Sequence, residues 1–247
     1  MQGTVQQTIR ELFNSNVGDR HLVDKFNLFD SSVSQKLWST EHYCKQLVSL
    51  NINEFRVFPF LSGTLSADAT TAEYMVLDPV LYCRNLNRLL DGFFMNSMST
   101  LDTLAHEIFT LYVCLSVPSH IYITTAKKVL TEVHASSKTA KLLDEQLSQG
   151  WFAEFEPFRH CTTHESLIRY DDIEVSFDHV NNRYNLLKPI RLPDNPQVIP
   201  FTYDSNRVAS DYCQSILAKI QSLVADVYAS VLLDIRTNGD VLPIPTV

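Results

Sequence analysis

The stretch Ser99–Val117, STLDTLAHEIFTLYVCLSV, carries the clearest structural signal in this chain of 247 residues. Its aliphatic residues recur three and four positions apart, at Leu101, Leu104, Ile108, Leu111 and Leu115. This spacing lines up one apolar stripe on a helix, because an α-helix completes a turn in about 3.6 residues. Ser99 followed by Asp102 resembles a capping box, and Pro118 is a stop signal. The stretch therefore predicts a core helix over 99–116.

Similar periodicity on both sides of this stretch predicts a helix-rich chain. We expect further helices over the ranges 2–14, 33–50, 152–167 and 205–235, and one bent helix or two short ones over 122–135 and 138–149. The first two would be joined by a connection around 17–30, and Gly150 fits a C-terminal cap of the helix before it. The expected core is therefore built from packed amphipathic helices.

Two segments depart from the helical pattern. Residues 51–80 join an aromatic, β-prone run to a tract rich in Ser, Thr and Ala, which indicates a strand or extended piece followed by a loop. Residues 169–192 alternate apolar and polar side chains around Asn181-Asn182, a pair that tolerates the backbone of hairpin turns. The expected fold is mainly α: a helical bundle over 81–240 with a β-hairpin before its last helix, preceded by an extension over 1–80.

Composition limits the setting in which the chain works. The formal net charge is -8, which argues against a broad surface that coats nucleic-acid phosphates. The five cysteines are odd in number and form no C-x-x-C pair, which favours a reduced, intracellular compartment. The sequence has neither a signal-peptide pattern nor 18 uninterrupted apolar residues, so we expect a soluble cytoplasmic protein without a membrane partner.

The stretch 156–167, EPFRHCTTHESL, concentrates chemically active side chains more than any other. His160 and His164 are four apart, the spacing of paired histidine metal ligands, but no third ligand is evident. Cys161 could act as a nucleophile only if a base were oriented towards it, and a buried, inert thiol is the simpler interpretation. Neither a metal site nor a cysteine nucleophile has a complete set of residues here.

Arg159 and His164 together offer a third chemistry. Arginine binds phosphate oxygens with a planar fork of donors, and imidazole transfers protons near neutral pH. These two groups suffice to cleave RNA without a metal, by attack of the 2′-hydroxyl on the adjacent phosphorus. Five positions apart, however, they lie roughly 140° apart around one helix axis. Two copies that meet at a symmetric interface could pool both pairs in one cleft.

The sequence Arg159-His160-x-x-x-His164 resembles the R-x4-6-H motif of the HEPN superfamily, in which a polar residue follows the arginine. The order of core helix, further helices, motif helix and terminal helix is similar to HEPN domains over residues 80–235. The resemblance implies a homodimeric, metal-independent endoribonuclease without a cofactor, of the kind found in toxins and antiviral effectors, sometimes held by an antitoxin or regulatory protein.

Carried over to this sequence, the resemblance assigns the scissile phosphate to Arg159 and proton transfer to His164, with His160 positioning one of them. Asp102 and Glu107 on the preceding core helix could orient the motif. The alternative is a non-catalytic HEPN-like module for dimerisation, nucleotide binding or assembly, in which the polar stripe is a solvated helix face.

Overall fold

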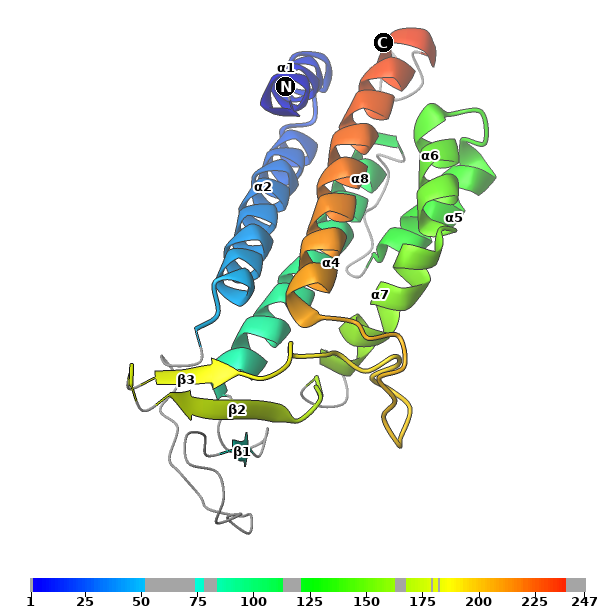
Figure 1. Cartoon of the computed structure of the whole chain (residues 1–247). Helices are drawn as coiled ribbons and strands as arrows, with labels where there is room; N and C mark the ends of the chain where they lie inside the picture. Colours follow the sequence, from blue (N-terminus) through cyan, green and yellow to red (C-terminus); the bar gives the residue numbers. More distant parts are fainter. Residues whose placement is uncertain are drawn as a thin grey trace. The chain divides into compact units, whose positions relative to one another are not determined.

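The computed structural model describes residues 2–51, 74–77, 84–112, 121–162, 168–178, 180–181 and 183–238. Within these ranges the chain forms seven helices and one small antiparallel sheet, so the expected mainly α class is confirmed (Figure 1). The expected boundary near residue 80 and most of the expected extended segment over 51–80 lie outside the described residues.

The helices are α1 Gln2–Asn16, α2 Arg20–Val48, α4 Arg84–Tyr112, α5 Ile123–Val133, α6 Lys138–Leu147, α7 Gly150–His160 and α8 Ala209–Asn238. The strands are β1 Tyr74–Leu77, β2 Ile173–Asp178 and β3 Arg183–Leu186. The chain divides into two compact units, and α2, α4, α7 and α8 contribute residues to both. Unit 1 comprises 1–40, 96–155 and 216–247, and unit 2 comprises 41–95 and 156–215.

The core of unit 1 contains the apolar stripe of the opening stretch. Leu101, Leu104, Ile108 and Leu111 are all buried, as their spacing predicts. Trp151 at the start of α7 packs against Phe155, with ring centroids 6.4 Å apart. These contacts remove large apolar surfaces from water, which is the main favourable contribution to folding.

Unit 1 also buries two carboxyl groups among hydrogen-bond donors. Asp234 of α8 is fully buried and accepts hydrogen bonds from the Tyr112 hydroxyl at 2.7 Å and from the backbone N–H groups of Lys138 and Thr139 at 2.8 and 3.1 Å. Asp234 thereby satisfies two amides at the start of α6 that have no partner within the helix. In a second cluster the Tyr228 hydroxyl donates to Oε2 of Glu107 at 2.9 Å.

A partly buried ion pair joins α1 to α2 within unit 1. Asp30 is fully buried and accepts from the guanidinium of Arg10, whose Nε lies 2.6 Å from Oδ2. The side-chain amide of Gln6 also donates to Asp30, and it lies 3.3 Å from the Tyr228 hydroxyl. The charge of Asp30 is therefore compensated, which a buried carboxylate requires.

Unit 2 holds the sheet, whose strand order is β1-β2-β3. β2 pairs antiparallel with β1 (Val175 opposite Met75) and with β3 (Val175 opposite Leu186). Ile173 and Val175 are buried and Glu174 between them is not, as the two-residue period of a strand dictates. β2 and β3 follow α7 in the chain and precede α8.

Several expected helix ends are wrong, each for a local reason. The connection around 17–30 is short because α2 already begins at Arg20, where Oδ1 of Asp19 accepts from the backbone N–H of His21 at 2.9 Å. α4 begins at Arg84, so Ser99 lies inside the helix and caps nothing. Gly150 is the first residue of α7, and Ser148 caps the end of α6.

Candidate functional site

The last turns of α7 divide their side chains between core and solvent. Phe155, Phe158 and Cys161 recur every three residues and are buried. Glu156 and His160 lie four residues apart on the opposite side and are exposed, and Arg159 is half-buried. The arginine and the first histidine of the predicted motif are therefore accessible, while the residues beside them anchor the helix.

Phe158 fixes the end of α7 within unit 2. Its ring stacks on Phe94 of α4, with centroids 5.0 Å apart and planes at 10°, and it contacts Tyr212 of α8 at 5.4 Å. The guanidinium of Arg207 lies 5.5 Å from the Phe158 ring centre and 4.8 Å from that of Tyr212. Aromatic and cation–π contacts of this kind hold the backbone of Arg159 in place.

The connection over 191–208 packs against the same end of α7. The Arg207 guanidinium donates to the carbonyl oxygens of Pro193 and Asp194 at 3.1 and 3.0 Å. The carboxylate of Asp194 accepts hydrogen bonds, most strongly from Ser205 and next from Thr202. These hydrogen bonds hold the pKa of Asp194 well below its usual range. The Cys161 sulfur lies 4.0 Å from the carbonyl oxygen of Pro196. A connection ordered in this way can contribute to a defined pocket.

A pocket of about 170 Å³ opens at this end of α7, lined by Glu156, Pro157, Arg159, His160 and Gln197. It brings together a guanidinium, an imidazole, a carboxylate and an amide. Sequence reasoning missed Glu156 and Gln197. Glu156 had a signal, because it precedes His160 by four residues, whereas only the fold places Gln197 here.

The α-helical part of α7 ends at His160, and 161–162 form a wider, π-helical turn in which the Thr162 hydroxyl donates to the Arg159 carbonyl at 2.9 Å. The remainder of the expected helix over 152–167 lies outside the described residues. His164 lies outside the described residues, so its convergence with Arg159 stays a prediction.

Asp91 of α4 is a polar residue near the motif that the sequence did not reveal. Burial raises the pKa of its carboxyl, and a hydrogen bond from the backbone N–H of Ile168 opposes that rise. Its Oδ1 is buried with no hydrogen-bond partner among the described residues. Because Ile168 is eight residues beyond the end of α7 at His160, Asp91 holds the chain that follows the motif.

The two acidic residues proposed to orient the motif have other partners in unit 1. Oδ1 of Asp102 lies 3.3 Å from the backbone nitrogen of Ile123, at the start of α5. Glu107 is buried and accepts from Tyr228, and burial raises the pKa of its carboxyl well above 4.5. Both geometries are those of structural carboxyl groups, and a role of these two residues in orienting the motif stays a prediction.

The burial of Cys161 and the grouping of possible metal ligands bear on the two other interpretations of this stretch, a cysteine nucleophile and a metal site. Cys161 is 2% exposed, which fits the inert-thiol interpretation because a nucleophile must reach its substrate. Among the described residues no three side chains of His, Cys, Asp or Glu are grouped so that they could hold a metal ion.

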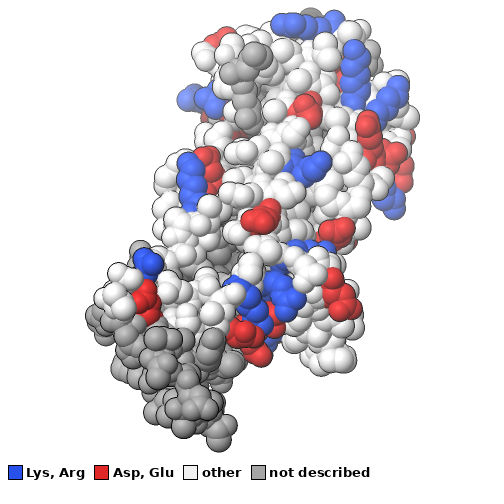
Figure 2. All heavy atoms as spheres, in the orientation of Figure 1, with Lys and Arg blue, Asp and Glu red and all other residues white. Residues whose placement is uncertain are grey.

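Charge is distributed in small clusters. Figure 2 shows Lys and Arg interspersed with Asp and Glu on the face drawn, with no extended basic area there. Around β2, for example, Lys188 pairs with Glu174 at 2.8 Å and with Asp171 at 3.2 Å. Any contact with a phosphate on this face is therefore local, as the net charge suggested.

Within the part of the chain that the structure describes, one helix has the length and hydropathy of a membrane span. Residues Ala209–Thr237 of α8 meet this test by length and composition alone, and 44% of their 18-residue apolar window is buried inside the protein. The core helix of a soluble protein passes the same test, and α8 carries the buried Asp234. A cytoplasmic location stays a prediction.

Comparison with known proteins gives no relative: no family model, no curated protein and no solved structure matches this chain. The function must therefore be argued from the residues of the site.

Proposed function

We propose that this chain is an endoribonuclease of HEPN type that cleaves RNA without a metal, at a site shared by two copies. The HEPN-like bundle with the β2–β3 hairpin before its last helix belongs to the same proposal. The observation that carries it is the open pocket at the end of α7, in which Arg159 and His160 lie side by side in sequence over a buried aromatic anchor.

The residues have distinct roles in the proposed reaction. Arg159 binds two oxygens of the scissile phosphate and neutralises the charge that develops there. A histidine, His164 by the motif, removes the 2′-hydroxyl proton, and His160 orients the reacting groups. The 2′ oxygen bonds to phosphorus as the bond from phosphorus to the 5′ oxygen breaks, and an acid protonates that leaving oxygen. The products are a 2′,3′-cyclic phosphate and a 5′-hydroxyl.

In this proposal a second copy supplies the acid, because His164 of one copy acts as the base and His160 orients the reacting groups. The pocket of one copy contains one guanidinium and one imidazole among its described lining residues. A two-fold interface through α7 would double both groups in one cleft. A role as a toxin or antiviral effector, held by an antitoxin or regulatory protein, would follow from such an activity.

The test uses the full chain, single-stranded RNA of mixed sequence and excess chelator. We expect cleavage to products that end in a 2′,3′-cyclic phosphate. Arg159→Ala and His164→Ala should each reduce the rate by about 100-fold or more, the usual cost of losing one charge-stabilising or proton-transfer group. Arg159→Lys should rescue little, because lysine keeps the charge but loses the planar fork.

Matched controls use exposed residues at the start of α2. Arg20→Ala and His21→Ala remove the same side-chain types and should leave the rate unchanged. Sedimentation analysis of the wild type should give a dimer. A dimer that does not cleave RNA would favour the assembly module instead, and cleavage that survives in both Arg159→Ala and His164→Ala would reject the proposal.

A further inference from the structure

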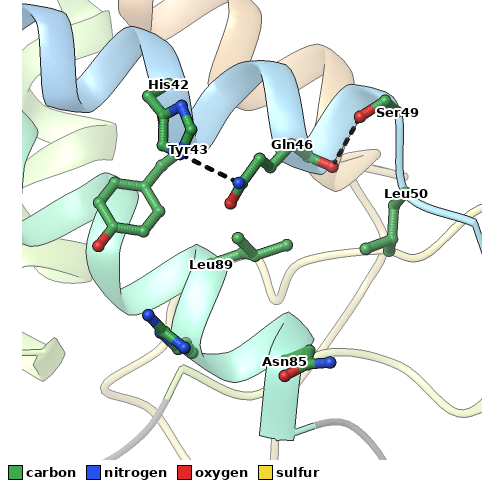
Figure 3. A pocket seen from close by; sticks show the side chains of 8 residues that line it. His42, Tyr43, Gln46, Ser49, Leu50, Asn85 and Leu89 are labelled. Atoms are coloured by element: carbon green, nitrogen blue, oxygen red, sulfur yellow. Dashed lines mark hydrogen bonds between the residues drawn. The ribbon is translucent and has the colours of Figure 1, made fainter. Parts of the chain in front are cut away.

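A larger pocket, about 480 Å³, lies elsewhere in unit 2 and shares no lining residue with the motif pocket. The end of α2 lines it with His42, Tyr43 and Gln46, the two residues after Val48 add Ser49 and Leu50, and the first turns of α4 line it with Asn85, Arg88 and Leu89. Figure 3 shows Gln46 extending from α2 into the space above Leu89 of α4. The volume falls in the range of about 300–1,000 Å³ that is usual for small-molecule sites.

The pocket is lined by one face of each helix. Positions 42, 46 and 49 follow one another at steps of four and three, and 85 and 88 are three apart. The intervening Cys44, Leu47, Leu86 and Leu90 are buried and form the core instead. The polar character of the lining is therefore a property of these two helix faces.

The Tyr43 ring lies in the pocket wall against Gly92, in space that a larger residue would fill. A Cβ atom at Gly92 would lie 2.5 Å from Cε1 of Tyr43, closer than side chains can approach. Only glycine lets the Tyr43 ring lie so close to α4. The Gln46 amide nitrogen lies 3.0 Å from Nε2 of His42, which fixes the imidazole along α2. Two of the lining side chains are therefore positioned before any ligand arrives.

The described lining offers many hydrogen-bond donors and one permanent positive charge. Arg88, His42, Gln46 and Asn85 present guanidinium, imidazole and amide groups, and no Asp or Glu is among the described lining residues. Glu41, one residue from His42, is paired with Lys45 at 2.5 Å, which offsets its charge. Leu89, Leu50 and the Tyr43 ring supply apolar surface beside these donors.

We propose that this pocket binds a phosphomonoester attached to a flat organic group. A terminal phosphate has three strong acceptor oxygens and nearly two negative charges, which match the fork of Arg88 and the neighbouring imidazole and amides. The organic group lies on Leu89 and the Tyr43 ring. A free nucleoside monophosphate and the 5′-phosphorylated end of an RNA both carry this chemistry.

Isothermal titration calorimetry on the full chain tests the proposal, with AMP, adenosine and a 5′-phosphorylated RNA hexamer as probes. We expect AMP to bind and adenosine to bind at least about tenfold more weakly, because adenosine lacks the charge-assisted hydrogen bonds. Arg88→Ala should weaken AMP binding by about 10- to 100-fold. Arg84→Ala is the matched control, because Arg84 is exposed on the same helix but does not line the pocket.

The remaining arms identify the source of the phosphate and separate this site from the ribonuclease. Binding of AMP identifies a free nucleotide, and binding of the hexamer alone identifies an RNA end. Arg159→Ala should bind the same probe as the wild type. Failure of the ribonuclease proposal would therefore leave the proposed phosphate-binding pocket to be judged by its own binding data. If neither probe binds, or if Arg88→Ala binds as well as Arg84→Ala, the proposal is overturned.

Discussion

A few carboxyl groups of unit 1 lie in the core, whereas charged side chains of unit 2 line pockets. Asp234 and Asp30 are fully buried and accept hydrogen bonds from backbone amides, a hydroxyl, an amide side chain and a guanidinium. Arg159 and Arg88 instead line open cavities. Removing a charge should therefore change stability in unit 1 and function in unit 2.

The largest effect on stability is expected for Asp234→Ala. It leaves the amides of Lys138 and Thr139 without their acceptor, and the Tyr112 hydroxyl keeps only the Thr139 hydroxyl, 2.8 Å away, as an acceptor. Unsatisfied buried donors cost about 1–3 kcal/mol each, so we expect a loss of roughly 3–5 kcal/mol. Urea denaturation followed by circular dichroism measures it.

Asp234→Asn is the matched variant, because it keeps one acceptor oxygen and removes the charge. It should lose less stability than Asp234→Ala. Equal losses in the two variants would show that the charge, rather than the number of acceptors, stabilises this end of α6.

Glu107→Gln should alter the pH dependence of stability. Burial first, and then the nearby Asp30 charge, raise the pKa of the Glu107 carboxyl, against hydrogen bonding from Tyr228 and the charge of Arg10. Because the folded pKa lies above the unfolded one, the wild type loses stability as the pH rises from about 4.5 towards the folded value. Each unit of that shift corresponds to about 1.4 kcal/mol, and the glutamine variant lacks this dependence.

Melting temperatures at pH 5 and pH 8 test this prediction. The wild type should lose more of its melting temperature between the two than Glu107→Gln does. Parallel curves would mean that Glu107 is ionised in the folded protein at both values.

The smallest effect on stability is expected for His160→Ala. The imidazole is exposed at the end of α7, and substitutions at such sites usually change stability by less than about 0.5 kcal/mol. The same urea titration should overlay that of the wild type. A loss above about 1 kcal/mol would show that His160 stabilises the fold, as Asp234 does in unit 1. That result would argue against a role of His160 in catalysis.

The sequence predicted elements through their apolar periodicity and missed what depends on distant partners. Leu101, Leu104 and Ile108 are buried as their spacing indicates. Ser99 and Asp102 failed as a cap because the helix continues on both sides of them, and Asp102 instead meets Ile123. Asp19, which does cap α2, was a readable signal, since Asp is a preferred N-cap residue.

The candidate site was predictable only in part. Arg159 and His160 stand out by residue type, and the pocket contains both. Gln197 and Asp91 come from segments far away in the chain, and no local pattern could connect them to the motif. The end of α7 at His160 was also hidden, because the apolar spacing of Phe155, Phe158 and Cys161 runs through it.

The packing of Trp151 at the start of α7 provides an optical reporter. The chain has two tryptophans, and Trp38 is 66% exposed on α2. Trp38→Phe would leave a single indole on the helix that carries Arg159, eight residues before it. Its emission would then follow that helix during titration with RNA, without any added dye.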